Sequence, residues 1–168
     1  PADITPAQQF AAERAQRRAA LSGRKQLRRV EVGPYCTFYF ECFDTMAFQI
    51  QEMLHIEGGG EAQLADELAA YNPLVPRGDE LVATIMFEID EPERRARVLA
   101  QLGGVESHFF IRVGNERIAG TQETDVERTR DDGKASSVQF AHFRFTPAQV
   151  RAFADPAVSV MTGADHPA

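Results

Sequence analysis

The stretch LVATIMFEI, residues 81–89, is the strongest indication of the fold because every second side chain along its whole length is apolar. Leu81, Ile85 and Phe87 fall on one side of an extended chain, and Thr84 and Glu88 fall on the other. A period of two residues is typical of a β-strand that turns one face to the core. We therefore predict a strand here, with its apolar face buried.

Three further stretches alternate in the same way and predict further strands, namely residues 35–42, 105–113 and 136–145. Capping residues and terminal glycines predict helices over residues 5–22, 46–57, 61–71 and 91–102, and a short one from residue 146. Weaker patterns predict one or two strands within residues 116–127, a charged turn at 129–134 and a terminal strand at 158–161.

Strands joined by hairpins and interspersed with helices favour an antiparallel sheet. The sequence therefore predicts an α+β fold with a largely antiparallel sheet of about five to seven strands and about four to five helices, mostly packed on one face. We expect one globular domain over residues 1–168. Residues 1–24 would form an amphipathic basic helix, and residues 25–168 the α+β body.

Composition narrows the class of protein. The net charge is −7, but residues 1–30 carry a net of +5, which leaves −12 for the rest. No apolar run approaches the roughly 20 residues of a membrane span, and residues 1–18 lack a signal-peptide pattern. Cys36 and Cys42 are too few for a disulfide framework, which predicts a cytoplasmic location.

The second face of the predicted sheet carries side chains that bind anions, ligate metals or transfer protons. It would collect Tyr35, Tyr39, Glu41, Glu88, His108, Arg112, His142 and Arg144. Arg112 and Arg144 could then hold a carboxylate or phosphate. His142 could act with Glu41 or Glu88 as a ligand or an acid–base pair. The alternative is a solvated or self-associating face with cross-strand ion pairs.

The histidines raise the question of a metal site. Glu52 and His55 have the i, i+3 spacing of di-iron carboxylate bundles, but those sites need two such pairs. The alternative for this pair is a solvent-facing position near a helix end. A site made from Glu52, His142 and His166 requires the fold to bring all three together. Cys42 precedes a predicted helix, where a thiol is reactive unless it is buried.

Five segments resemble a bacterial family known as domain of unknown function 3501. They are residues 28–34, 49–53, 67 with 71–76, 80–84 and 165–167, so the resemblance extends from about residue 23 to 167. The resemblance implies no established activity. It does imply genes beside a rubrerythrin-like protein and an iron–sulfur oxidoreductase, and hence a redox or peroxide-stress setting. It favours Glu52, Tyr71, Asn72, His142 and His166 as site residues and implies that His55 is variable.

These observations leave three function classes open. No nucleophile, phosphate-loop or dinucleotide motif is present, which favours an accessory or interaction subunit that docks on a redox protein or forms a homo-oligomer. The second class is a small-molecule or metal-binding protein, or an enzyme, that uses the polar face; the sequence specifies no cofactor. The third is nucleic-acid binding through the arginines of residues 14–29, which the acidic balance and the lack of interleaved aromatics disfavour.

Overall fold

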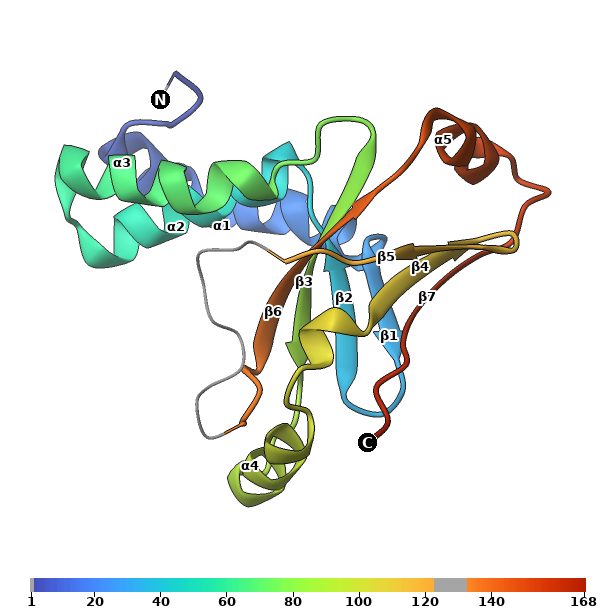
Figure 1. The fold of residues 1–168 in the computed structure, drawn as a ribbon. Coiled ribbons are helices and arrows are strands. Elements are labelled where there is room, and N and C mark those ends of the chain that lie inside the picture. The colour runs from blue at the N-terminus through green and yellow to red at the C-terminus, as the bar shows by residue number, and fades with distance from the viewer. Residues whose placement is uncertain (1, 123–132) are drawn as a thin grey trace. The chain divides into compact units, whose positions relative to one another are not determined.

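The computed structural model describes residues 2–122 and 133–168 (Figure 1). The chain forms two compact units, each built from two separate segments. Unit 1 contains Pro1–Arg29 and Glu41–Pro76, and unit 2 contains Val30–Phe40 and Arg77–Ala168. The predictions for residues 123–127, and for most of the charged turn at 129–134, lie outside the described residues.

Unit 1 is helical. It consists of α1 (Ala7–Gln26), α2 (Phe43–Glu57), α3 (Gly60–Tyr71) and the short η1 (Asn72–Leu74). Helix α2 packs against both α1 and α3. The buried ring of Phe10 in α1 meets the rings of Phe48 and His55 in α2, each at a centroid distance of 5.9 Å. Aromatic edge contacts of this kind fix one helix against the other.

The start of α2 differs from the prediction, which placed Asp44 and Thr45 ahead of the helix. The helix begins at Phe43, and Cys42 is its N-cap residue. The hydroxyl of Thr45 accepts the backbone N–H of Cys42 at 2.9 Å and donates to the carboxylate of Glu41. The side chain of Cys42 in turn accepts the backbone N–H of Thr45, and this capping box satisfies donors that a helix start leaves free.

Unit 2 contains two antiparallel sheets. The four-stranded sheet has the order β1 (Arg29–Val32), β2 (Cys36–Phe40), β3 (Glu80–Phe87), β6 (Val138–Arg144). The three-stranded sheet has the order β5 (Glu116–Ala119), β4 (Phe109–Val113), β7 (Val160–Ala164). The remaining elements are α4 (Pro92–Gln101), η2 (Val105–Ser107) and α5 (Pro147–Ala154).

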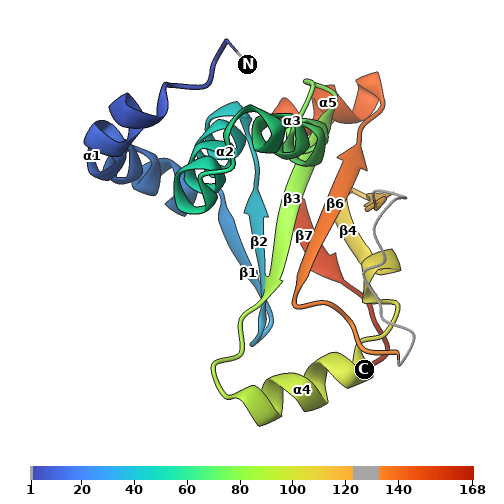
Figure 2. The ribbon, with the colours of Figure 1, turned by 90° about the vertical axis from the view of Figure 1, so that its left-hand side faces the viewer.

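The core of unit 2 lies between its two sheets, which pack face to face (Figure 2). The ring of Phe38 in β2 meets the ring of Phe109 in β4 at 5.6 Å, and Phe143 in β6 lies 6.4 Å from Phe38. All three are fully buried. We expected helices to cover the apolar face of the sheet, but a second sheet with its own apolar face covers it here. Two half-apolar sheets can bury each other in this way.

The predicted fold class is confirmed. The described residues form five α-helices and seven strands in two antiparallel sheets, which is an α+β fold. The strand predicted from residues 81–89 is also confirmed: burial alternates from Ala83 to Ile89, whereas Val82 on the second face is buried as well. Within the described ranges, no helix is both long enough and apolar enough to cross a membrane.

Candidate functional site

The strongest candidate site is the face of the three-stranded sheet that points away from the core. Along β4, Phe109 and Ile111 are buried between the sheets, while the intervening side chains point outward. The strand register places Gly163 beside Phe110, and places Arg117 and Met161 on either side of Arg112. We call this surface the β4 face; it consists of His108, Phe110, Arg112, Arg117, Met161, Gly163 and Asp165.

Phe110 forms the floor of the β4 face. The tip of its ring lies against Gly163, where a Cβ atom would come within 2.8 Å of the ring. On the solvent side, the guanidinium carbons of Arg117 and Arg112 lie 4.6 and 5.7 Å from the ring centroid. A cation over an aromatic face is attracted by the negative potential of the ring. The glycine therefore admits the ring, and the ring holds both arginines.

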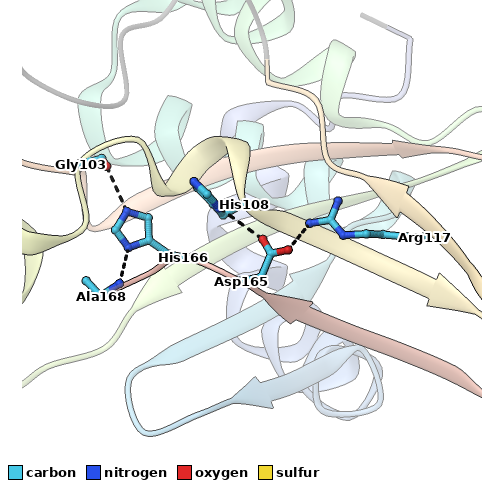
Figure 3. Close-up of polar contacts among 6 residues, drawn as sticks. All are labelled: Gly103, His108, Arg117, Asp165, His166 and Ala168. Atoms are coloured by element: carbon cyan, nitrogen blue, oxygen red, sulfur yellow. Dashed lines mark hydrogen bonds and ion pairs between the residues drawn. The ribbon is translucent and has the colours of Figure 1, made fainter.

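An ion-pair cluster borders this floor (Figure 3). The carboxylate of Asp165 accepts a hydrogen bond from Nη2 of Arg117 at 2.8 Å and lies 3.3 Å from Nδ1 of His108. Partial burial raises the pKa of Asp165, but the hydrogen bonds and charges of Arg117 and His108 outweigh it and leave the pKa lowered. The side chain of Asp165 nevertheless remains 54% exposed. The carboxylate is therefore bound and ionised but open to solvent.

His166 anchors the segment that carries Asp165. Its Nε2 lies 3.1 Å from the carbonyl oxygen of Gly103, and its Nδ1 accepts the backbone N–H of Ala168 at 3.2 Å. Its ring meets the ring of His108 edge-on, with centroids 5.0 Å apart. These partners assign the proton to Nε2. With both nitrogens engaged, His166 has no lone pair free for a metal.

Arg112 differs from Arg117 in its charge balance. The two residues are direct cross-strand partners, a position at which like charges repel. Asp165 compensates Arg117. Among the residues that the structure describes, no carboxylate lies against Arg112, whose guanidinium lies over the Phe110 ring. Within those residues, the charge of Arg112 is therefore uncompensated, and guanidinium groups bind carboxylates and phosphates through two parallel hydrogen bonds.

A second cluster lies on β3 and β6 of the four-stranded sheet. Nδ1 of His142 lies 3.2 Å from Oε2 of Glu80, and Nε of Arg144 lies 3.8 Å from the same oxygen. The side chains of Glu80 and His142 are only 8% and 11% exposed. His142 therefore pairs with Glu80, a residue that the sequence analysis did not name as its partner. Glu80 was missed because the predicted strand began at residue 81. A strand that begins at residue 80 places Glu80 on the same face as Val82, and in the structure Glu80 is the register partner of Arg144.

The remaining residues of the predicted polar face are dispersed. The hydroxyl of Tyr39 donates to Glu88 at 2.8 Å, so these two meet on one face. Glu41 lies beyond the end of β2 and is buried at the start of α2. Arg112 and Arg144 lie on different sheets, so the fold does not join them in one clamp. Cys36 lies in the core, where burial, followed by the charge of Glu88, raises its pKa to about 12.

In unit 1, the candidate ligand Glu52 is already occupied. Nε and Nη2 of Arg14 bind its two carboxylate oxygens at 2.7 and 2.8 Å. The hydrogen bond from Arg14 lowers the pKa of Glu52. Tyr71 and Asn72 lie where α3 meets η1 in the same unit. Within residues 2–122 and 133–168, no cluster of three or more His, Cys, Asp or Glu side chains could hold a metal ion.

Three basic residues of α1 bind acidic residues of their own unit. Besides the pair between Arg14 and Glu52, Arg24 binds Asp44 and Arg17 binds Glu13 one turn earlier. Part of the positive charge of α1 is therefore paired within unit 1.

Fold and site together define an α+β protein with two face-to-face antiparallel sheets and an exposed arginine–histidine face. The chain belongs to the family described as Protein of unknown function (DUF3501), whose model matches residues 1–168. The resemblance seen in the sequence is thereby confirmed over the whole chain.

A solved structure is similar to this one throughout. It is the crystal structure of a novel protein of unknown function from Burkholderia pseudomallei K96243, at 34% sequence identity and a TM-score of 0.89. The match covers 98% of this chain and 85% of that chain. No curated protein matches the chain.

Proposed function

We propose that this protein is an interaction subunit that docks on a partner protein through the β4 face. The supporting observation is the set of side chains exposed there: Arg112 and Arg117 lie over an aromatic ring, and Met161 beside them is 53% exposed. Arginine, methionine and aromatic residues are the types enriched where proteins bind each other. The face offers a charged specificity element next to an apolar contact area.

The position of β7 adds to this proposal. It is a terminal strand in the order β5-β4-β7, and Val160 and Met161 on it are both exposed. A terminal strand presents backbone donors and acceptors along its outer side, and partner segments pair with such edges. A partner seated on the β4 face can therefore also contact this strand.

The partner that we propose is a redox protein of the cytoplasm. This part of the proposal rests on the family resemblance, which implies genes for a rubrerythrin-like protein and an iron–sulfur oxidoreductase nearby. In this role, the chain would position or protect a redox enzyme rather than carry out the chemistry itself.

The test is a paired capture from the native host with cross-linking. The baits are the wild type, Met161→Glu on the β4 face, and Arg97→Gln, which removes an exposed charge on α4. We expect a redox protein to be recovered by the wild type and by Arg97→Gln but lost with Met161→Glu. The purified partner should show the same order of affinities by calorimetry. Recovery of no redox partner, or equal recovery with all three baits, would refute the proposal.

A second candidate function is small-molecule binding at the Glu80–His142–Arg144 cluster. The observation in its favour is a carboxylate and an imidazole that are both nearly buried, next to an arginine side chain that is 79% exposed. The test is a thermal-shift screen with small carboxylates and phosphates. A stabilising compound should lose its effect in Arg144→Gln, and a screen without any shift would exclude this candidate.

A further inference from the structure

Building on the proposed function, we infer that the β4 face binds a carboxylate side chain from an acidic segment of the partner. That carboxylate would lie between Arg112 and Arg117 and would replace the protein's own Asp165, which acts as an internal ligand. The inference names the recognised group and the contact that must break when the partner binds.

The first step of the argument is that Asp165 already shows which group this surface accepts. Its carboxylate binds a guanidinium and an imidazole from two other elements, Arg117 on β5 and His108 beside β4 (Figure 3). The contacts are a single N–H to oxygen bond at 2.8 Å and a longer one at 3.3 Å. Because more than half of the side chain remains in water, the pair contributes little stability. Such a carboxylate can exchange for another one at small cost.

The second step is that the face has more positive charge than Asp165 neutralises. Arg112 is the direct cross-strand neighbour of Arg117, and both guanidinium groups lie over the ring of Phe110. Within the described parts of the chain, Arg112 has no acidic partner, so the repulsion between the two arginines is relieved only on one side. An incoming carboxylate that contacts both arginines would gain a second charge-assisted bond that Asp165 does not make.

The third step concerns the occupant, which we take to be a protein carboxylate. The exposed apolar side chain of Met161 adjoins Arg112 on the terminal strand β7. A peptide segment can cover this side chain and pair with the strand edge, whereas a free anion can do neither. The isolated basic face also complements an acidic segment, although the chain as a whole carries a charge of −7.

The experiment measures binding of a fluorescent glutamate-rich peptide to the full chain by anisotropy. A glutamine-rich peptide of equal length serves as the ligand control, and inorganic phosphate serves as a competitor. The variants are Arg112→Gln, Arg117→Gln and Asp165→Asn, with Arg97→Gln as the matched control for loss of one exposed arginine. Glutamine keeps part of the apolar stem and removes only the charge.

We expect Arg112→Gln and Arg117→Gln to weaken binding of the glutamate peptide by about three- to tenfold, and Arg97→Gln to leave the affinity unchanged. Asp165→Asn should tighten binding by up to about fivefold, because it removes the internal competitor. The glutamine peptide should bind weakly to every variant, and added salt should reduce the differences. Circular dichroism checks the fold of each variant. If Arg112→Gln does not fold, Arg112→Lys replaces it, with weaker binding again expected.

Four outcomes would overturn the inference. Arg112→Gln could bind as tightly as Arg97→Gln, or Asp165→Asn could fail to tighten binding. Phosphate could bind while the glutamate peptide does not, which would make a small anion the ligand. Sedimentation could show self-association that Arg112→Gln abolishes, which would make a second copy the occupant.

The two proposals can fail separately. If capture of a partner depends on Met161 but the partner binds Arg112→Gln with undiminished affinity, the docking function stands and the inferred carboxylate binding is refuted. If the peptide behaves as expected but no redox partner is captured, the inferred carboxylate binding stands and the proposed function is refuted.

Discussion

The two sheets of unit 2 each carry one histidine, one carboxylate and one arginine in contact, but in opposite environments. In the four-stranded sheet, Glu80 and His142 are almost buried and 3.2 Å apart. In the three-stranded sheet, Asp165 and His108 are 3.3 Å apart and substantially exposed. The two clusters therefore share residue types but differ in burial.

Burial changes what happens when a partner is lost. A buried carboxylate deprived of its partner cannot turn to water, so removing one member of the pair is expensive. An exposed carboxylate is rehydrated, so its partners can be exchanged. We therefore interpret the Glu80 cluster as a contact that stabilises the pairing of β3 with β6. The Asp165 cluster is a contact whose partners can be exchanged.

The largest expected effect comes from breaking the buried cluster. Replacing His142 by alanine leaves the carboxylate of Glu80 without its imidazole partner, and we expect a loss of about 3 kcal/mol in the free energy of unfolding. Urea denaturation followed by circular dichroism measures it. His108→Ala, the matching change in the exposed cluster, should leave the urea midpoint nearly unchanged. Equal losses in both variants would contradict the comparison.

An intermediate effect is expected at Glu52 in unit 1. Its side chain is 13% exposed and accepts hydrogen bonds from two guanidinium nitrogens of Arg14. Glu52→Gln should lower the melting temperature by roughly 5 °C near neutral pH. Because folding lowers the pKa of Glu52 below 4.5, its stabilising contribution is complete above that pH and is lost as the pH falls through the folded pKa. The melting temperatures of variant and wild type should therefore converge in acid; a constant difference would contradict this origin.

A smaller effect is expected at Gly163, which supports the exposed cluster from below. An alanine Cβ would lie 2.8 Å from the tip of the Phe110 ring, so the ring must shift toward the two arginines. We expect Gly163→Ala to cost about 1 kcal/mol in the free energy of unfolding. It should also weaken binding of the glutamate peptide more than Arg97→Gln does. Unchanged peptide affinity would mean that the ring does not position the arginines.

The same comparison explains which parts of the molecule could be predicted from the sequence. Alternation identifies faces within one strand, and the interior positions of Phe38, Ile85 and Phe109 follow from it correctly. Alternation carries no information on which strands share a sheet. For that reason, Arg112 and Arg144 looked like members of one face, although they lie on separate sheets.

Ends of elements and weak strands account for the residues that were missed. Glu41 continued the alternation of β2, but the Thr45 hydroxyl draws it into the start of α2. Arg117 lies in β5, a four-residue strand too short to show a clear period, so its pairing with Asp165 was not predicted. Contacts between residues that are 48 positions apart depend on the fold rather than on any local pattern.

The smallest expected effect is a change in the pKa of Asp165. It tests whether a peptide carboxylate can replace Asp165 on Arg117. The hydrogen bonds and charges of Arg117 and His108 lower the pKa of Asp165 below 3.8 against the opposing effect of partial burial. Its small contribution to stability is therefore present above pH 3.8 and lost as the pH falls through the folded pKa. A carboxyl-detected NMR titration should find the lowered pKa in the wild type and a higher one in Arg117→Gln. Addition of the glutamate peptide at neutral pH should shift the Asp165 carboxyl resonance toward its position in Arg117→Gln, because the peptide replaces Asp165 on the same arginine. A resonance that does not move while the peptide binds would show that the peptide and Asp165 occupy different places.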